Sequence, residues 1–162
     1  EKDGVDVIAV PCNSAHGWYD EVSESITVPW LNIIKVTSEE VKKKGILHPL
    51  VVSAYVPWKL RLYNQFLDEV QYFNEEDMNC FYGIIERLKT NHNKTVIKKE
   101  FYELVQGYRD VADGLIIACT EPSMLFDSDE TRFCSFKLVD SASVYARQCV
   151  SLCLDQKEED EY

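Results

Sequence analysis

The chain has 162 residues, 46% of them hydrophobic and 12% aromatic, which is enough apolar material for one domain or two small lobes. Its formal net charge of −11 leaves no basic stripe that could displace counterions from a phosphate backbone, so no nucleic-acid partner is expected. No apolar run reaches transmembrane length and no secretory signal is visible, so we expect no membrane association and a reduced, cytoplasmic compartment.

Strands and helices are expected to alternate along the chain. Apolar and β-branched runs predict strands at residues 5–10, 28–34, 48–55, 114–122 and 136–140. Helical periodicity and capping residues predict helices from about residue 15 and over 37–45, 58–70, 75–89, 96–111 and 141–154. This alternation is typical of an α/β fold with parallel sheets.

The six cysteines show neither CxxC pairs nor the Cys/His spacing of a zinc site, so we expect free thiols and no metal. Cys80, Cys149 and Cys153 fall within predicted helices and are interpreted as small core hydrophobes. Cys134 offers nothing more specific.

Two cysteines stand apart because each ends a predicted buried strand. "DGVDVIAVPCNS" and "DGLIIACTEP" share an Asp-Gly pair, an apolar strand, a cysteine (Cys12 or Cys119) and then hydroxyl or amide groups. Ligands of open α/β sheets bind at the carboxyl ends of strands, where both thiols are expected. The repeat suggests two related lobes.

A thiol at a strand-to-helix turn is expected to have a lowered pKa, because the helix N-terminus favours the thiolate. A single such cysteine would favour nucleophilic catalysis by Cys12, with His16 as its partner. Two thiols on opposing lobes favour proton transfer instead. One removes a proton from a carbon while the other delivers a proton to the opposite face, which inverts that carbon.

The turns "PCNSAH" and "ACTEP" resemble the signature turns of the aspartate/glutamate racemase family, whose members use a cysteine from each of two α/β lobes and no cofactor. The segments "WYDEV…ITVPWLNI", "IIERLK" and "VDSASVYARQCV" follow the family's order, so the resemblance covers nearly the whole chain. It implies two pseudo-symmetric parallel-sheet lobes, formed by residues 1–45 plus 140–162 and by residues 46–139.

The resemblance also implies a site for a small anionic amino acid. Cys12 and Cys119 would be the acid/base pair. The residues expected to contact the substrate are Asn13, Ser14 and Thr120, and those expected to support the turns are His16 and Glu121.

Two departures from the family pattern bear on activity. The family's opening strand and Gly-rich loop have no counterpart here, so the first lobe is expected to be incomplete. Either the chain is a fragment, or a homodimer partner or a complementing N-terminal segment supplies the missing piece, or this lobe is rebuilt. The equivalent loop of the second lobe reads "SAYVPWK", in which Pro57 lacks an N–H and Tyr55 and Trp58 add bulk. A non-catalytic carboxylate-binding relative and a single-thiol lyase or hydrolase therefore remain alternatives to a racemase.

Overall fold

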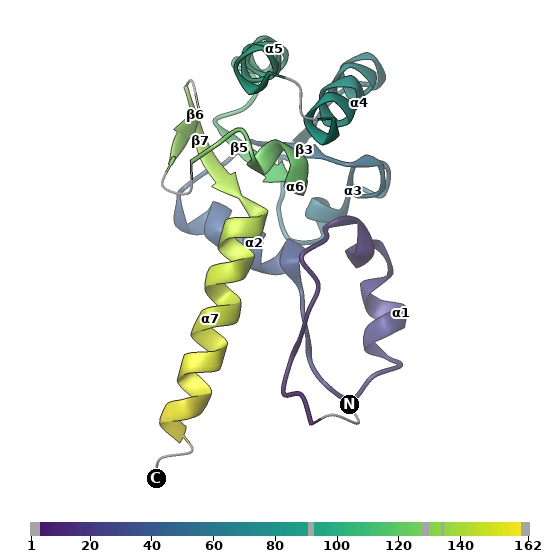
Figure 1. The fold of residues 1–162 in the computed structure, drawn as a ribbon, viewed down its shortest axis with the longest axis vertical. Helices are drawn as coiled ribbons and strands as arrows, with labels where there is room; N and C mark the ends of the chain where they lie inside the picture. Colours follow the sequence, from purple (N-terminus) through teal and green to yellow (C-terminus); the bar gives the residue numbers. More distant parts are fainter. Residues whose placement is uncertain (1–3, 91–92, 128–129, 134, 160–162) are drawn as a thin grey trace.

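The computed structural model describes residues 4–90, 93–127, 130–133 and 135–159, and it is an α/β fold in which parallel strands dominate (Figure 1). The main sheet has five strands in the order β4-β3-β5-β7-β6. Its strands are β3 (Pro49–Ser53), β4 (Gln71–Tyr72), β5 (Gly114–Ala118), β6 (Arg132–Phe133) and β7 (Phe136–Asp140). Only β6 runs antiparallel to its neighbour. The predicted fold class is confirmed.

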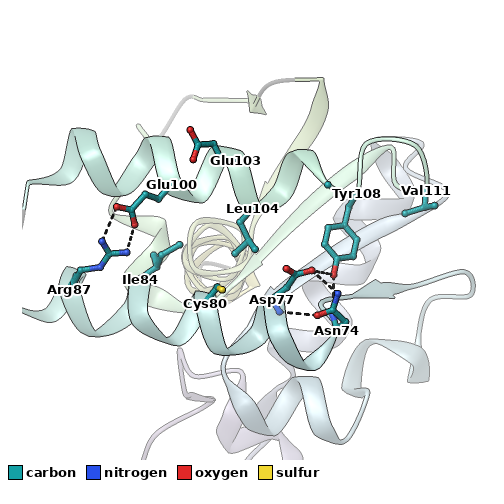
Figure 2. Close-up of a pocket in the computed structure, with 11 residues that line it drawn as sticks. Asn74, Asp77, Cys80, Ile84, Arg87, Glu100, Glu103, Leu104, Tyr108 and Val111 are labelled. Carbon is teal, nitrogen blue, oxygen red and sulfur yellow. Dashed lines mark hydrogen bonds and ion pairs between the residues drawn. The ribbon is translucent and has the colours of Figure 1, made fainter.

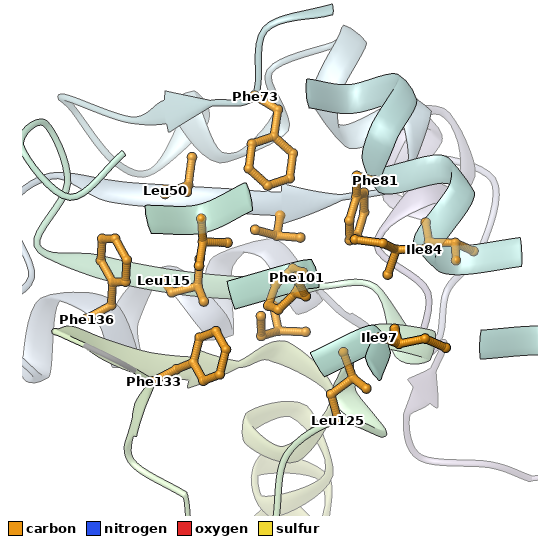
Figure 3. Packing of buried hydrophobic residues seen from close by; sticks show 14 of the residues in the cluster. Leu50, Phe73, Phe81, Ile84, Ile97, Phe101, Leu115, Leu125, Phe133 and Phe136 are labelled. Atoms are coloured by element: carbon orange, nitrogen blue, oxygen red, sulfur yellow. The ribbon is translucent and has the colours of Figure 1, made fainter. Parts of the chain in front are cut away.

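One face of this sheet is covered by α4 (Glu75–Lys89) and α5 (Lys94–Gln106). Figure 3 shows the packing beneath them, where aromatic side chains of the helices meet aliphatic residues of β3 and β5. Phe81 and Phe101 are fully buried with ring centroids 6.1 Å apart. The amphipathic pattern of the two helices therefore places a continuous apolar stripe on the sheet.

The opposite face is covered by α2 (Ile33–Lys43), the 3-10 helix η2 (Leu62–Gln65) and α7 (Ser141–Glu159). Both α2 and α7 contact β7. The helices that sequence reasoning assigned to the first lobe thus pack on the sheet assigned to the second. The two lobe boundaries themselves stay a prediction.

A separate two-stranded parallel sheet is formed by β1 (Ile8–Ala9) and β2 (Trp30–Leu31). The expectation that residues 5–10 form a strand buried on both faces is wrong, because β1 is short and Ala9 is exposed. Tyr145 of α7 fastens this sheet, since its hydroxyl donates to the Leu31 carbonyl oxygen (2.7 Å) and accepts from the Val10 N–H (3.0 Å). Between β1 and β2 lie η1 (Ser14–Trp18) and α1 (Tyr19–Ser23).

Two further predicted elements are wrong in detail. Residues 28–34 were expected to be one strand, but α2 begins at Ile33 because the Asn32 side chain caps it, accepting from the Lys35 N–H at 3.0 Å. Residues 58–70 were expected to be one helix. Instead α3 (Tyr55–Lys59) ends before Arg61, whose φ of 51° is left-handed, and η2 follows.

No helix of the described residues is both long enough and apolar enough to cross a membrane.

Candidate active site

The two strand-end cysteines line one cavity of about 270 Å³. The cavity lies where the turn after β1 meets the carboxyl ends of β3 and β5. Its lining consists of residues 11–14, 54, 82, 85, 89 and 118–121. Six of the seven residues predicted for the site line this cavity, and the exception is His16. The six are Cys12, Asn13, Ser14, Cys119, Thr120 and the predicted supporting residue Glu121.

His16 lies outside this lining, and its ring is hydrogen-bonded to the backbone of the turn that carries Cys12. The Ile33 N–H donates to His16 Nε2 at 3.2 Å, so the neutral ring carries its proton on Nδ1, which donates to the Cys12 carbonyl oxygen at 2.8 Å. Burial lowers the pKa of His16 below its usual value, which keeps the ring neutral. Both ring nitrogens are therefore engaged with backbone groups rather than with the Cys12 thiol.

Asn13 is buried, and both ends of its amide are hydrogen-bonded within the protein. Its Nδ2 donates to Ser141 Oγ at 3.0 Å, and its Oδ1 accepts from the Tyr63 hydroxyl at 2.7 Å. This arrangement ties the residue after Cys12 to α7 and to η2. Because Nδ2 keeps a second N–H and Oδ1 a second lone pair, these two bonds leave the predicted contact between Asn13 and a substrate as a prediction.

The second turn carries its own hydrogen-bond network. Cys119 directly follows β5, and its thiol donates to Glu121 Oε2 at 3.0 Å. The Thr120 hydroxyl donates to the same oxygen at 3.1 Å. Glu121 thus contacts both of its neighbours in the turn.

The pKa of the Cys119 thiol differs from the sequence-based expectation of a lowered value. Burial raises it to about 12, and the Glu121 carboxylate acts in the same direction. Burial alone would raise the pKa of Glu121, but the hydrogen bonds it accepts from Cys119 and Thr120 leave it lowered. The expectation was wrong for this thiol because desolvation and an adjacent anion outweigh the N-terminus of α6 (Thr120–Ser123), which spans only four residues.

Three of the lining residues that sequence reasoning missed come from α4. Tyr82 and Lys89 lie on the same face of this helix as Ile85, at the spacing that helix geometry brings together. Lys89 is the only lysine or arginine among the described residues that line the cavity, and it pairs with Glu86 at 3.1 Å. The helical periodicity was visible in the sequence, but which face of α4 meets the thiols was not.

The predicted crowding by Tyr55 and Trp58 is wrong. From that loop only Ala54 lines the thiol cavity. The two aromatic side chains line a neighbouring cavity of about 180 Å³, which shares Tyr82 with the first. The loop therefore leaves space beside the thiols.

A larger cavity of about 710 Å³ lies between α4 and α5, away from the thiol pair (Figure 2). An ion pair between Arg87 and Glu100 crosses it at one end, and the Tyr108 hydroxyl donates to Asp77 Oδ2 at the other (2.7 Å). Cys80 lines this groove and is exposed, so its interpretation as a core hydrophobe is wrong.

The same correction applies to Cys153, which is exposed because α7 extends past the body of the molecule. Cys149 is half-buried and packs against the hydrophobic cluster beneath α2 and α7, in agreement with its interpretation. Cys134 lies outside the described residues. Within the described ranges, no group of three or more His, Cys, Asp or Glu side chains is placed to hold a metal ion.

Two parallel-sheet units, each presenting a cysteine at a strand end to a common cavity, define a class of α/β protein suited to acid/base chemistry on a small ligand. The sequence of residues 1–149 matches the Asp/Glu/Hydantoin racemase family, and the chain belongs to that family.

Its relatives include proteins described as racemases. The chain is 28% identical to the broad specificity amino-acid racemase RacX of Bacillus subtilis (strain 168), over 95% of this chain and 67% of RacX. Among solved structures, it matches an aspartate racemase homologue from Pyrococcus horikoshii OT3 with a TM-score of 0.78 and 25% identity, over 93% of this chain and 68% of that one.

The aspartate racemase of Picrophilus torridus shares the fold, with a TM-score of 0.73 and 22% identity over 93% of this chain and 64% of that one. The chain thus spans about two thirds of the length of these relatives.

Proposed function

We propose that this protein is a cofactor-independent racemase of a small amino acid, with aspartate or glutamate as the substrate class, and that Cys12 and Cys119 are its acid/base pair. The observation that carries the proposal is the shared cavity, because thiols from two different sheets reach one space of about 270 Å³. Family membership and the similarity to RacX support the same reaction class.

The reaction balances without an external oxidant or reductant. In one direction, the Cys12 thiolate takes the α-proton, so that an S–H bond forms as the C–H bond breaks and the electron pair delocalises into the substrate carboxyl group. The S–H bond of Cys119 then breaks and its proton is delivered to the opposite face of the carbon. Proton exchange with water restores both sulfurs, and the opposite direction exchanges their roles.

The raised pKa of Cys119 fits the proton-donor half of this scheme, since a thiol with a pKa of about 12 keeps its proton at neutral pH. The hydroxyl of Ser14 and the ammonium group of Lys89 are available along the same cavity for the carboxylates of the substrate. Lys89 is the group that we assign to the side-chain carboxylate of aspartate or glutamate.

The single-thiol alternative, with His16 activating Cys12, is disfavoured by the hydrogen bonds of the ring. His16 Nδ1 donates to the Cys12 carbonyl oxygen and Nε2 accepts from the Ile33 N–H, so neither nitrogen is directed at the thiol as a base.

The proposal is tested by incubating the protein with L-aspartate, L-glutamate and a panel of other L-amino acids in deuterated water. We expect a D-enantiomer that carries deuterium at the α-carbon, detected by chiral chromatography with mass spectrometry. Cys12→Ala and Cys119→Ala should each abolish inversion. Cys80→Ala and Cys153→Ala, which replace exposed cysteines outside the cavity lining, should not.

Each alternative has its own outcome in this experiment. Loss of activity in Cys12→Ala alone would favour a single-thiol enzyme. Ligand binding without any α-proton exchange in the intact protein would favour a non-catalytic relative and would overturn the proposal.

A further inference from the structure

Both thiol turns are hydrogen-bonded to the junction where β7 passes into α7, each through one of two adjacent residues. Ser141, the first residue of α7, accepts the hydrogen bond from Asn13 Nδ2 at 3.0 Å, and it is 2% exposed. Asn13 directly follows Cys12. The start of α7 is therefore connected to the first turn by a buried bond, although the two segments are 128 residues apart in the sequence.

The preceding residue, Asp140, connects to the second turn. The Ser123 hydroxyl donates its single proton to Asp140 Oδ1 at 2.7 Å, and Ser123 is the last residue of α6, the helix that begins directly after Cys119. The parallel register explains the proximity, because Asp140 pairs with Ile117, two residues before Cys119.

The junction itself is held firmly. Asp140 Oδ1 accepts from the Ala142 N–H at 3.2 Å and Oδ2 accepts from the Ser143 hydroxyl at 2.6 Å, so the carboxylate also caps α7. On the other side, the Tyr63 hydroxyl donates to Asn13 Oδ1 at 2.7 Å from a fully buried position. Asn13, Tyr63 and Ser141 are buried, and a satisfied buried polar network fixes its members in one geometry, whereas Asp140 is half-buried.

We propose that Asp140 and Ser141 are positioning residues that hold the Cys12 turn and the Cys119 turn in register across the cavity. This inference rests on the proposed function, in which two sulfurs must face opposite sides of one carbon. It assigns Asn13 to the placement of Cys12 through Ser141 and Tyr63. It also gives Ser123 a role, since its hydrogen bond to Asp140 fixes α6, the helix that begins directly after Cys119.

Two variants loosen one turn each without altering a thiol. Ser141→Ala removes the acceptor of Asn13, and Ser123→Ala removes the hydrogen bond between α6 and Asp140. Ser38→Ala is the control matched to Ser141→Ala, because Ser38 is as buried as Ser141 and its hydroxyl donates within α2, to the Ile34 carbonyl oxygen at 2.8 Å. Circular dichroism and urea unfolding give the folded fraction of each variant.

The decisive readout separates proton exchange from inversion. A displaced thiol turn still allows one sulfur to remove and return a proton on the same face, whereas inversion needs both sulfurs. We expect each variant to lower kcat by about tenfold to a hundredfold, as sub-ångström to ångström misplacement does, with a much smaller change in KM. The ratio of α-deuteration with retention to α-deuteration with inversion should rise. A merely structural role would lower α-deuteration with retention and α-deuteration with inversion in proportion to the folded fraction. The ratio of the two would then stay unchanged, which would overturn the proposal.

A second measurement needs no activity. Bis-maleimides of increasing span are reacted with the substrate-free protein, and peptide mapping identifies the Cys12–Cys119 cross-link. We expect one preferred span in the native protein and in Ser38→Ala, and a broader range of spans in Ser141→Ala and Ser123→Ala. An unchanged span preference in both variants, or no cross-link at any span in the native protein, contradicts the proposal. If the native protein cross-links as expected but exchanges no α-proton, the proposed function fails while the positioning role stands.

Discussion

The thiol of Cys119 donates a hydrogen bond to Oε2 of Glu121 at a distance of 3.0 Å, and Glu121 lies two residues later in the same turn. An ionised acceptor stabilises the thiol and disfavours the thiolate, and burial of the sulfur acts in the same direction. The second turn is thus arranged to hold a proton at neutral pH. A proton donor in an inversion reaction needs this state before the substrate carbon has been deprotonated.

Replacing Glu121 by Gln should lower the pKa of Cys119 from about 12, because the negative charge beside the sulfur is lost while burial remains. Each unit of decrease gives about tenfold more thiolate at pH 8. The measurement is the rate of iodoacetamide alkylation at the Cys119 peptide as a function of pH. Glu39→Gln, an exposed carboxylate on α2, serves as the control. A Cys119 profile that is identical in Glu121→Gln and the native protein would contradict the role given to the carboxylate.

Replacing Lys89 by Met should raise the KM for aspartate and glutamate several-fold and change kcat less. The methionine keeps an apolar stem but removes the only lysine or arginine charge among the described residues of the cavity lining. Lys99→Met is the matched control on α5, where Lys99 lies 3.9 Å from Glu103 and away from the thiols. If both variants bind the acidic substrates as the native protein does, Lys89 does not hold the side-chain carboxylate.

The buried neutral state of His16 predicts a pH dependence of stability. Burial lowers its pKa in the folded state below the usual 6.5, so the unfolded chain binds more protons in the window beneath that value. The contribution to stability is therefore fully present above about pH 6.5 and is lost as the pH falls through the folded pKa. Urea unfolding at about pH 7 and pH 5.5 should show this loss, and the difference should shrink in His16→Gln. His48→Gln, at an exposed position, should keep the native difference.

The elements with a strong period were predictable from the sequence. Residues 75–89 form α4 over the predicted range, because Asn74 caps it by accepting from the Asp77 N–H at 2.8 Å and the apolar stripe is uninterrupted. β7 also matches its predicted range, and β3 and β5 lie within theirs.

Short segments were not predictable, because tertiary context decides their conformation. The two isoleucines after Asn32 have high β propensity, yet they begin a helix whose apolar face meets the main sheet. The first strand was expected to be longer, but β1 pairs with β2 alone among the described residues and gains little burial.

Within the candidate site, the repeated strand–cysteine motif and the family resemblance were sufficient to predict that Cys12 and Cys119 share one cavity, although the two residues follow strands of different sheets. The pKa of Cys119 was not predictable in the same way. It depends on burial beneath α4 and on the rotamer that aims the thiol at Glu121, and neither follows from the local motif. The hydrogen bonds of Asn13 to Ser141 and Tyr63 come from distant segments and were equally hidden.

The close approach of β5 to the segment before β3 makes Gly114 a sensitive position. A Cβ atom there would overlap the side chain of Ile46, which is buried. Gly114→Ala should therefore reduce the free energy of unfolding by about 1–3 kcal/mol through overpacking. Ile46→Ala leaves a cavity of its own. The double variant should nevertheless lose less free energy of unfolding than the two single losses added together, since the methyl group introduced at position 114 then occupies vacated space.

Gly83→Ala is the control, because Gly83 is an exposed residue within α4 whose added Cβ would meet nothing within 4 Å. This control should gain about 0.5–1 kcal/mol from the lower backbone entropy of alanine in the unfolded chain. Urea unfolding of the four variants gives these energies, and strict additivity between positions 114 and 46 would contradict the overlap.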